Sequence, residues 1–282
     1  MDRSDLAIRM KEYYENIPKI KLMRRTPVAI RIDGKAFHTF TKGFQKPFDE
    51  VLIKSMQETM KYLCENIQGC VFGFAESDEI TLILVDYKKL NSSAWFDYEV
   101  QKICSIAASM ATMAFNKYFS ENVANEILEY KTSMVPQCVE IQQEIKEYHN
   151  TLRAAVNKGA MFDARCFNIP KEEVTNLIYW RQLDATRNSI QMVGQANFSH
   201  KELQNKTCNM IQDMLHEQKG INWNNFPAYQ KRGSACIKKI TAPSDLSENP
   251  HYEWFIDKNM PILKGEDRKY LDRFIYVENN EK

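Results

Sequence analysis

The sequence predicts an α+β fold built on a split βαβ sheet, with the helices of that unit on one face. Through residue 167 the sequence patterns run in the order strand, helix, strand, strand, helix, strand. The second and third strands are joined by so short a connection that they must pair as a hairpin. Right-handed crossovers then place both helices on the same face and lay the first strand antiparallel beside the third. At 282 residues with 44% hydrophobic residues, the chain can bury a sizeable core.

The strands and helices of this sheet are predicted from hydrophobic periodicity. Alternating β-branched residues predict a first strand over 28–32, which Gly34 ends. Apolar residues at three- and four-residue spacing predict helices over 48–67 and 97–119. The remaining strands are predicted at 70–75, 80–85 and 160–167.

The rest of the chain surrounds this sheet. Residues 120–160 are polar and helical in character, which predicts a helical insertion. From residue 241 the chain is rich in proline and aromatic residues, which predicts a C-terminal appendage of unassigned role over 241–282, after a body spanning 1–240. Further helices are predicted at 3–16, 171–196 and 199–218, with loop and strand over 220–240.

Composition excludes several classes of protein. The net charge of +1 gives no overall basicity for nucleic-acid binding, which would need local patches such as Lys231 and Arg232; such patches are equally typical of solvated surface. The seven cysteines form no Cys-x-x-Cys pair, which suits reduced thiols in a cytosol. The N-terminus lacks the order of a signal peptide, and no apolar run is long enough to span a bilayer. We therefore expect a cytoplasmic protein that does not span a membrane.

A candidate site lies where the first strand ends. In the predicted topology Asp33 lies beside Asp78 and Glu79, at the start of the third strand. Carboxylates brought so close repel each other strongly unless something offsets the charge. One answer is a raised pKa on one carboxyl group. The other is a hard divalent cation, held by carboxylate oxygens, water and substrate phosphates.

The neighbouring residues favour the cation. Gly34 lets the backbone approach a ligand closely, and residues 34–38 offer successive N–H groups to phosphate oxygens. Ser77 adds a hydroxyl, and positive charge is available from Lys35, Lys46 and Lys102. Two metal ions bridged by two carboxylates are the usual device for in-line phosphoryl or nucleotidyl transfer. The alternative is that Asp33 is an ordinary strand-end residue and the acidic segment an ordinary hairpin tip.

Short motifs along the chain form an ordered series. Arg31-Ile32-Asp33-Gly34-Lys35-Ala36-Phe37-His38 is followed by Phe44-Gln45-Lys46-Pro47 and then by Ser77-Asp78-Glu79. Further along come Phe162-Asp163-Ala164-Arg165, Trp180-Arg181-Gln182-Leu183-Asp184 and the segment 223–233. Together the motifs resemble the tRNA(His) guanylyltransferase family of 3′–5′ nucleotidyltransferases, and the resemblance covers roughly residues 5–240.

The resemblance implies a polymerase-type palm and a reaction at the 5′ end of a tRNA. ATP would activate the 5′-monophosphate as an adenylylated end, and the 3′-hydroxyl of GTP, or of a template-directed NTP, would then attack it. Asp33, Asp78 and the backbone carbonyl of Gly34 would hold two Mg²⁺ ions, with Glu79 assisting nearby. The implied triphosphate site is Asp33, Gly34, Lys35, Ala36, Phe37, His38, Ser77 and Asp78, with Lys46 and Lys102 near the phosphates. Family members are commonly tetramers, so a homotetramer is expected.

One segment departs from the family pattern. Members that add the extra G of histidine tRNA carry His-Ile-Asn-Asn after the Trp-Arg-Gln stretch. This chain has Thr186-Arg187-Asn188-Ser189, so only Asn188 is retained. The departure resembles the guanylyltransferase-like branch, whose members tend to repair 5′-truncated tRNAs by template-directed addition.

Polar residues near these motifs are candidate RNA contacts: Arg165, Arg181, Arg187, Asn188, His200, Lys231 and Arg232. The arginines can equally pair with Asp163 or Asp184, and His200 can be plain surface. Two other functions stay open. A nucleotide cyclase would also use paired aspartates and metal on a palm, and a non-catalytic module is possible because the split βαβ topology also serves RNA recognition.

Overall fold

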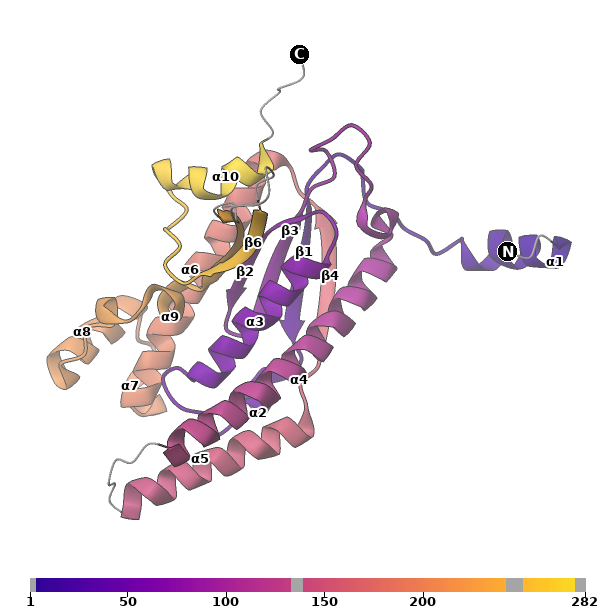
Figure 1. The fold of residues 1–282 in the computed structure, drawn as a ribbon. Coiled ribbons are helices and arrows are strands. Elements are labelled where there is room, and N and C mark those ends of the chain that lie inside the picture. The colour runs from indigo at the N-terminus through magenta and orange to yellow at the C-terminus, as the bar shows by residue number, and fades with distance from the viewer. Residues whose placement is uncertain (1–3, 133–138, 242–250, 277–282) are drawn as a thin grey trace.

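The computed structural model describes residues 4–132, 139–241 and 251–276, which form a six-stranded antiparallel sheet flanked by helices (Figure 1). The strand order is β4-β1-β3-β2-β5-β6. The strands are β1 Val28–Gly34, β2 Cys70–Glu76, β3 Glu79–Leu84, β4 Phe162–Asn168, β5 Ser234–Thr241 and β6 His251–Asp257. The first four make the predicted split βαβ unit, with β1 antiparallel beside β3, and the predicted α+β class is confirmed.

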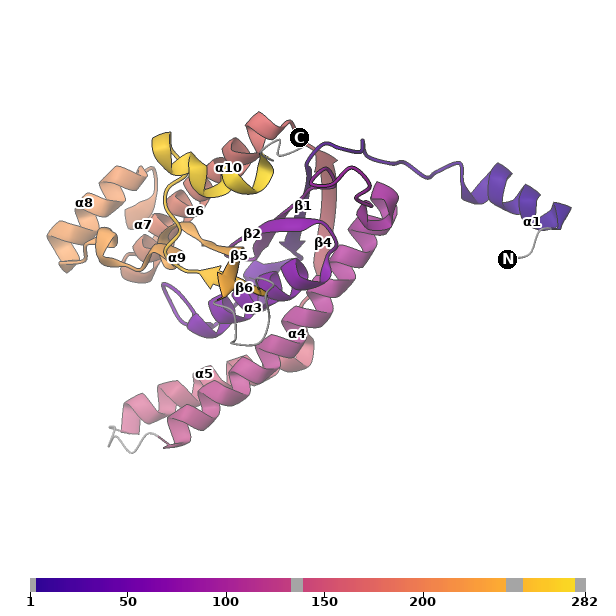
Figure 2. The same ribbon diagram turned by 45° about the horizontal axis from the view of Figure 1, so that its top comes forward.

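One face of the sheet is covered by α3 (Glu50–Asn66) and α4 (Val100–Thr132) (Figure 2). Helix α3 begins at Asp49, whose side chain accepts the N–H of Leu52 at 2.9 Å. Apolar side chains at helical spacing turn toward the sheet; they include Met56, Met60 and Leu63 of α3 and Ile103, Ala107 and Phe115 of α4. Burying each of the larger ones stabilises the fold by roughly 1.5–3 kcal/mol.

The opposite face is covered by α6 (Lys171–Asn197) and α10 (Lys269–Ile275) (Figure 2). Val174 and Ile178 of α6 pack in one cluster with Phe72 and Ile83 of the sheet. Strands β2 and β3 are buried along their whole length, which explains their continuous apolar runs. Since helices cover both faces, a ligand pocket has to form at the ends of the strands.

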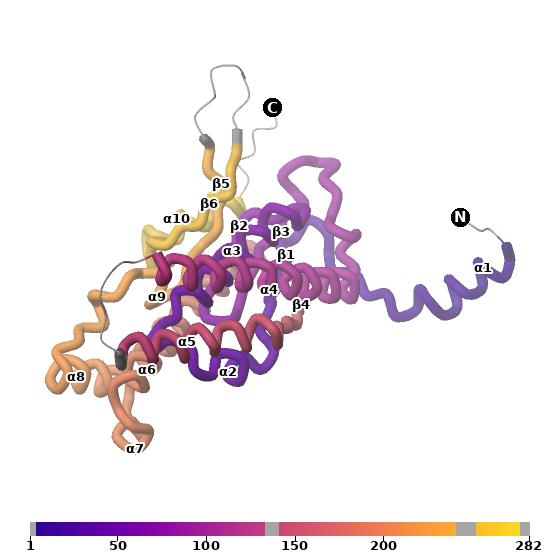
Figure 3. Tube along the Cα trace, turned by 60° about the horizontal axis from the view of Figure 1, so that its bottom comes forward, coloured from indigo at the N-terminus to yellow at the C-terminus, as the bar shows by residue number. Residues whose placement is uncertain are grey.

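The predicted helical insertion consists of the end of α4 and of α5 (Val139–Lys158). Helix α4 continues past the predicted limit at residue 119 to Thr132, and α5 runs back beside it (Figure 3). Leu152 of α5 is fully buried, and the hydroxyl of Tyr148 donates to Asp49 at 2.9 Å. The insertion is therefore packed on the start of α3. Within the described residues, no helix has both the length and the apolar character needed to cross a membrane.

The helix predicted over 199–218 is in fact two helices, α7 (His200–Leu203) and α8 (Cys208–Lys219). Asn205 adopts a left-handed conformation (φ 62°) between them, and Thr207 begins the second helix by accepting the N–H of Met210 at 3.3 Å. The segment between β1 and α3 contains a short helix, α2 (Phe37–Phe40). Another short helix, α9 (Ala228–Arg232), precedes β5.

The two ends of the described chain differ in how they meet the body. Helix α1 (Asp5–Met10) continues into a π-helical stretch, Lys11–Glu15, and the two project away from the rest of the molecule (Figure 3). Neither contains a buried residue. At the other end, β6 pairs with β5, and α10 packs on the sheet. The boundary predicted at residue 240 falls within β5.

Candidate active site

The end of β1 and the β2–β3 turn lie side by side, as the predicted strand order requires. Asp33 is in register with Glu79, and the N–H of Gly34 donates to the backbone carbonyl of Asp78 at 3.0 Å. The turn consists of Ser77 and Asp78, with Ser77 in the left-handed region at φ 47°. The fold thus brings Asp33 and Asp78 together.

Both aspartates are electrostatically strained in the absence of a counter-charge. Burial raises the pKa of Asp33, and the charges of Glu79 and Asp163 raise it further. Burial likewise raises the pKa of Asp78, to which the charge of Asp33 adds, while hydrogen bonds from its own backbone and from Ser77 act in the opposite direction. A cation between the two aspartates would relieve this repulsion.

The donor set fits a hard divalent cation. Mg²⁺ is usually held by one or two carboxylates, with water and substrate phosphates completing its coordination. Asp33 and Asp78 supply two carboxylates, and Gly34, whose backbone carbonyl is the third predicted ligand, directly follows Asp33. In the described ranges no group of three or more His, Cys, Asp or Glu side chains is arranged to hold a metal. Water or substrate oxygens would complete the coordination of a cation held by Asp33 and Asp78.

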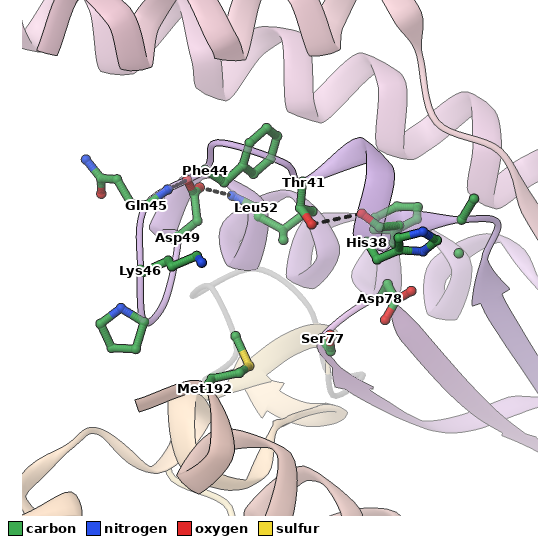
Figure 4. A pocket seen from close by; sticks show the side chains of 14 residues that line it. His38, Thr41, Phe44, Gln45, Lys46, Asp49, Leu52, Ser77, Asp78 and Met192 are labelled. Atoms are coloured by element: carbon green, nitrogen blue, oxygen red, sulfur yellow. Dashed lines mark hydrogen bonds between the residues drawn. The ribbon is translucent and has the colours of Figure 1, made fainter. Parts of the chain in front are cut away.

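A cavity of about 490 Å³ opens beside Asp78 (Figure 4). Lys46 and Asp78 lie on opposite sides of it in this view. The predicted triphosphate residues in its wall are Gly34, Ala36, Phe37, His38, Lys46, Ser77 and Asp78. The other lining residues are Thr41, Phe44, Gln45, Pro47, Asp49, Leu52 and Met192. A pocket of this volume with a lysine facing a carboxylate suits a phosphorylated ligand bound through a cation.

The phosphate loop is held in place by an aromatic cluster. The ring of Phe37 is buried, with its centre 5.1 Å from that of Phe40, 5.6 Å from Phe115 and 5.2 Å from Phe162. Ala36, in the left-handed region at φ 54°, starts α2. The packing of Phe37 therefore anchors the phosphate loop to the hydrophobic core next to the pocket.

Fewer backbone N–H groups face the pocket than the sequence suggested. Those of Gly34 and Lys35 are already used, because they donate to the carbonyls of Asp78 at 3.0 Å and Met161 at 2.8 Å. Among described residues, the N–H groups of Ala36, Phe37 and His38 have no backbone acceptor. These three are the groups that remain for a phosphate.

Glu79 and Arg181 occupy buried positions. The carboxylate of Glu79 pairs with Arg31, and the Nε of Arg181 lies 2.7 Å from its Oε1. Arg181 also lies 2.6 Å from Glu76 and 3.1 Å from Asp184. At 7% exposure Arg181 lies among these carboxylates rather than on the surface, which favours the alternative of structural pairing over the predicted RNA contact.

Lys102 is not brought to the pocket. It lies near the start of α4, with its Nζ 5.2 Å from the ring centre of Phe96. The start of α4 follows the end of β3 that lies away from Asp78. The α4 residue that reaches the start of β4 is Asn116, whose side-chain amide donates to the carbonyl of Ala160 at 2.9 Å. From 102 to 116 the helix advances about 21 Å. The implied phosphate contact of Lys102 therefore disagrees with the geometry.

The other predicted RNA residues lie at or near the surface. Arg165 on β4 is exposed and lies 3.4 Å from Asp163, and Arg187 is exposed and pairs with Asp184. The Nζ of Lys231 lies 2.5 Å from the carbonyl of Asn224, and burial lowers its pKa, helped by the charge of the half-buried Arg232.

Two further cavities contain predicted RNA residues in their walls. Asn188 lines one of about 80 Å³, which shares Asp49, Leu52, Ser77 and Met192 with the large pocket. His200 lines another of about 490 Å³ together with Lys206 and three glutamines, Gln191, Gln195 and Gln204.

Sequence reasoning missed two residues of the site. Met192 is 38% exposed and forms part of the pocket wall. Its spacing of four from Asn188 places both on one helical face, a signal that the sequence did offer. Glu76, in the acidic hairpin segment, is buried, and burial raises its pKa although the charge of Arg181 opposes the shift.

Fold and pocket together define an α+β nucleotidyltransferase with a palm-type sheet. The family model described as tRNAHis guanylyltransferase matches residues 7–170, which is more than half of the 282-residue chain. The chain belongs to this family and is a nucleotidyltransferase.

Solved structures and curated relatives agree with this assignment. A bacterial tRNA(His) guanylyltransferase-like protein in complex with ATP is 39% identical, with a TM-score of 0.77 over 97% of this chain and 100% of that one. Its complex with GTP matches at 37% identity and a TM-score of 0.72 over the same shares. The tRNA(His) guanylyltransferase of Saccharomyces cerevisiae is 26% identical over 230 residues, which are 75% of this chain and 82% of its own.

Proposed function

We propose that the protein is a 3′–5′ nucleotidyltransferase that activates the 5′ end of a tRNA with ATP and then adds a nucleotide to it. The observation that carries the proposal is that Asp33 lies next to the turn bearing Asp78, and that Asp78 and Lys46 line opposite sides of a pocket of about 490 Å³. The similar bacterial protein was solved with ATP and with GTP, the two nucleotides that such a reaction uses.

In this proposal each group has a defined task. Asp33, Asp78 and the carbonyl of Gly34 would hold two Mg²⁺ ions, which would offset charge on the phosphates. Lys46 would neutralise the triphosphate from the opposite wall, and the N–H groups of Ala36 to His38 would bind its oxygens. In the first step an oxygen of the RNA 5′-phosphate attacks the α-phosphorus of ATP and pyrophosphate leaves. In the second, the 3′-hydroxyl of the incoming nucleotide attacks the activated 5′-phosphorus and AMP leaves.

The RNA would lie along the surface that surrounds the pocket mouth. Arg165, Arg187, Asn188, His200, Lys231 and Arg232 are the proposed contacts, because they lie outside the core and most carry positive charge. The cavity next to His200 adds Lys206 and amide side chains that can bind phosphate and base edges. Since Thr186-Arg187-Asn188-Ser189 replaces the segment of histidine-tRNA enzymes, we propose template-directed 5′-end repair as the reaction, with histidine-tRNA maturation as the second candidate.

Self-association is part of the proposal. The N-terminal arm, residues 4–17, exposes apolar side chains such as Leu6, Tyr13, Tyr14 and Ile17 at 58–73%. An isolated chain would leave this surface in water, which is unfavourable. A homotetramer would cover it, and light scattering of the purified protein in solution measures the mass that decides this. The scattered, unpaired cysteines suit action in the cytoplasm.

The decisive experiment presents the protein with tRNAs that are intact or lack their first nucleotide, together with labelled ATP and each NTP. Incorporation of the nucleotide complementary to the opposite strand, only in truncated tRNAs, supports repair. Addition of G to intact histidine tRNA regardless of the opposite base would support maturation instead.

Matched variants separate the other functions. Asp33→Ala and Asp78→Ala should abolish incorporation while tRNA affinity stays within a few-fold. A cyclic product formed from GTP alone would replace the proposal with a cyclase. RNA binding that chelators do not affect, with no incorporation under any condition, would identify a non-catalytic binding module.

A further inference from the structure

A buried group of charges lies directly beneath the turn that carries Asp78. Glu76 is the last residue of β2 and Glu79 the first of β3, so the two glutamates flank the turn on both sides. Each is only 7% exposed. With Asp33 and Asp78, they place four carboxyl groups at one end of the sheet.

A single guanidinium joins the two glutamates. Arg181 of α6 places its Nη2 2.6 Å from Oε1 of Glu76 and its Nε 2.7 Å from Oε1 of Glu79. The Nη2 is also 3.1 Å from Oδ2 of Asp184, one turn further along the same helix. The Arg181 side chain is 8% exposed. Oε1 of Glu76 and Nε of Arg181 make no hydrogen bond within the described residues, so the guanidinium joins the two glutamates through charge, with separate nitrogens near each carboxylate that a single lysine ammonium would not provide.

A second arginine completes the balance of charge. Arg31 of β1 pairs with the other oxygen of Glu79, and its guanidinium carbon lies 5.5 Å from the ring centre of Trp180. The guanidinium carbon of Arg181 lies 4.8 Å from the same ring. The indole therefore lies against both arginines and limits where either can move.

These contacts leave different tasks for the four carboxyl groups. Glu76 and Glu79 are bound by protein cations, whereas Asp33 and Asp78 have no cationic partner within salt-bridge distance among the described residues. A divalent cation entering the site therefore meets two available carboxylates, held by a turn whose two flanking residues are fixed from α6.

We propose that Arg181 is a positioning residue for the catalytic turn. It fixes Glu76 and Glu79 to α6, which sets the position of Asp78 relative to Asp33 and keeps the two glutamates from competing for the metal. This inference rests on the proposed two-metal function and assigns Arg181 a role other than RNA contact.

Removal of Arg181 has a defined physical consequence. Two buried carboxylates lose their shared counter-charge, and breaking a buried pair in this way is strongly destabilising because a charge is left buried without a partner. The repulsion is then relieved by protonation of a glutamate or by movement of the turn, and either change alters how Asp78 is held beside Asp33. Residues that orient metal ligands from behind typically change metal affinity or activity by about 10–100-fold when replaced.

The test compares Arg181→Met and Arg181→Lys with Arg24→Met. Arg24 is a matched control because it pairs with the buried Asp86 at 2.5 Å, just past the opposite end of β3. Mn²⁺ alone is titrated into each full-length protein by electron paramagnetic resonance, and tRNA affinity and the kcat and KM of transfer are measured separately. We expect Arg181→Met to bind Mn²⁺ about 10–100-fold more weakly with lower kcat, and tRNA affinity to stay within about threefold. Arg181→Lys should be intermediate, and Arg24→Met should bind Mn²⁺ like the wild type.

The outcomes separate this inference from the function on which it rests. An Arg181→Met protein that binds Mn²⁺ normally but loses tRNA affinity overturns the inference and leaves the proposed function standing. A wild-type protein that binds no Mn²⁺ and transfers no nucleotide overturns the proposed function itself.

A variant that does not fold still gives a result. Adding Glu76→Gln and Glu79→Gln to Arg181→Met removes the unpaired charges, so the triple variant should recover a cooperative melting transition. If it stays unfolded, or if a folded Arg181→Lys protein matches the wild type in metal affinity and rate, the positioning role is refuted.

Discussion

Gly34→Ala tests whether the pocket geometry controls activity. Gly34 directly follows Asp33, and its N–H donates to the carbonyl of Asp78 at 3.0 Å. A Cβ at this position would lie 2.2 Å from Cδ2 of Phe37, whereas ordinary contact begins at 3.4 Å. The ring cannot withdraw, because it is packed against Phe40, Phe115 and Phe162.

The size of the effect follows from this distance. Going from 2.2 Å to 3.4 Å requires a movement of 1.2 Å, which the strand end and the loop must share. Overpacking of this kind costs about 1–3 kcal/mol of folding stability. A misplacement of about 1 Å between reacting groups lowers rates about 10²-fold. We therefore expect Gly34→Ala to lose roughly two orders of magnitude in kcat/KM while tRNA affinity is retained.

Single-turnover transfer and urea denaturation measure the two effects. Gly220→Ala is the control, because its Cβ would meet nothing within 4 Å and only its left-handed φ of 65° is strained. It should lose roughly 1–2 kcal/mol of folding stability, the cost of a left-handed conformation for a residue with a Cβ, and keep its activity. Phe37→Leu should partly rescue Gly34→Ala in a double-mutant cycle. A Gly34→Ala protein with wild-type stability and rate would refute the reasoning.

Three further predictions concern charge. The fold raises the pKa values of Asp33 and Asp78, so the metal-free folded protein keeps these two protons to higher pH than the unfolded chain does. The stability that these groups contribute should therefore fall as the pH rises above 3.8, the ordinary pKa of an aspartate. Mg²⁺ should raise the melting temperature at pH 7, where both groups can ionise to bind it, but not at pH 4. Lys46→Ala should raise the KM for the nucleotide about tenfold in initial-rate assays, and Lys102→Ala should not, since it lies at the far end of α4. Raising salt from about 50 to 200 mM should weaken tRNA binding about tenfold or more in filter-binding assays, and an unchanged affinity would count against an RNA substrate.

Sequence patterns were sufficient to predict those parts of the site that depend on which strands are neighbours in the sheet. The proximity of Asp33 and Asp78 followed from strand order alone, because a hairpin and right-handed crossovers allow few arrangements. The glycine after the strand predicted a ligand-binding loop over 34–38, and four of its residues, Gly34, Ala36, Phe37 and His38, line the pocket, whereas Lys35 does not. Both depend on contacts between neighbours in the sheet.

Other features depend on which way a side chain faces in three dimensions. Arg181 looks like an exposed basic residue in its motif, and only the distant Glu76 and Glu79 turn it into a buried one. Lys102 could have been placed correctly, since a helix that follows β3 must start at the end of the sheet opposite Asp33. The helix break at Asn205 depends on a single left-handed residue, to which hydrophobic periodicity is insensitive.

The projecting N-terminal arm affects how measurements on this protein are to be compared. If the apolar side chains at Leu6, Tyr13 and Ile17 are covered by another copy of the chain, folding and association are coupled by mass action. Melting temperatures would then rise with protein concentration, and removal of residues 1–17 would abolish that dependence. Variants should therefore be ranked at one fixed concentration.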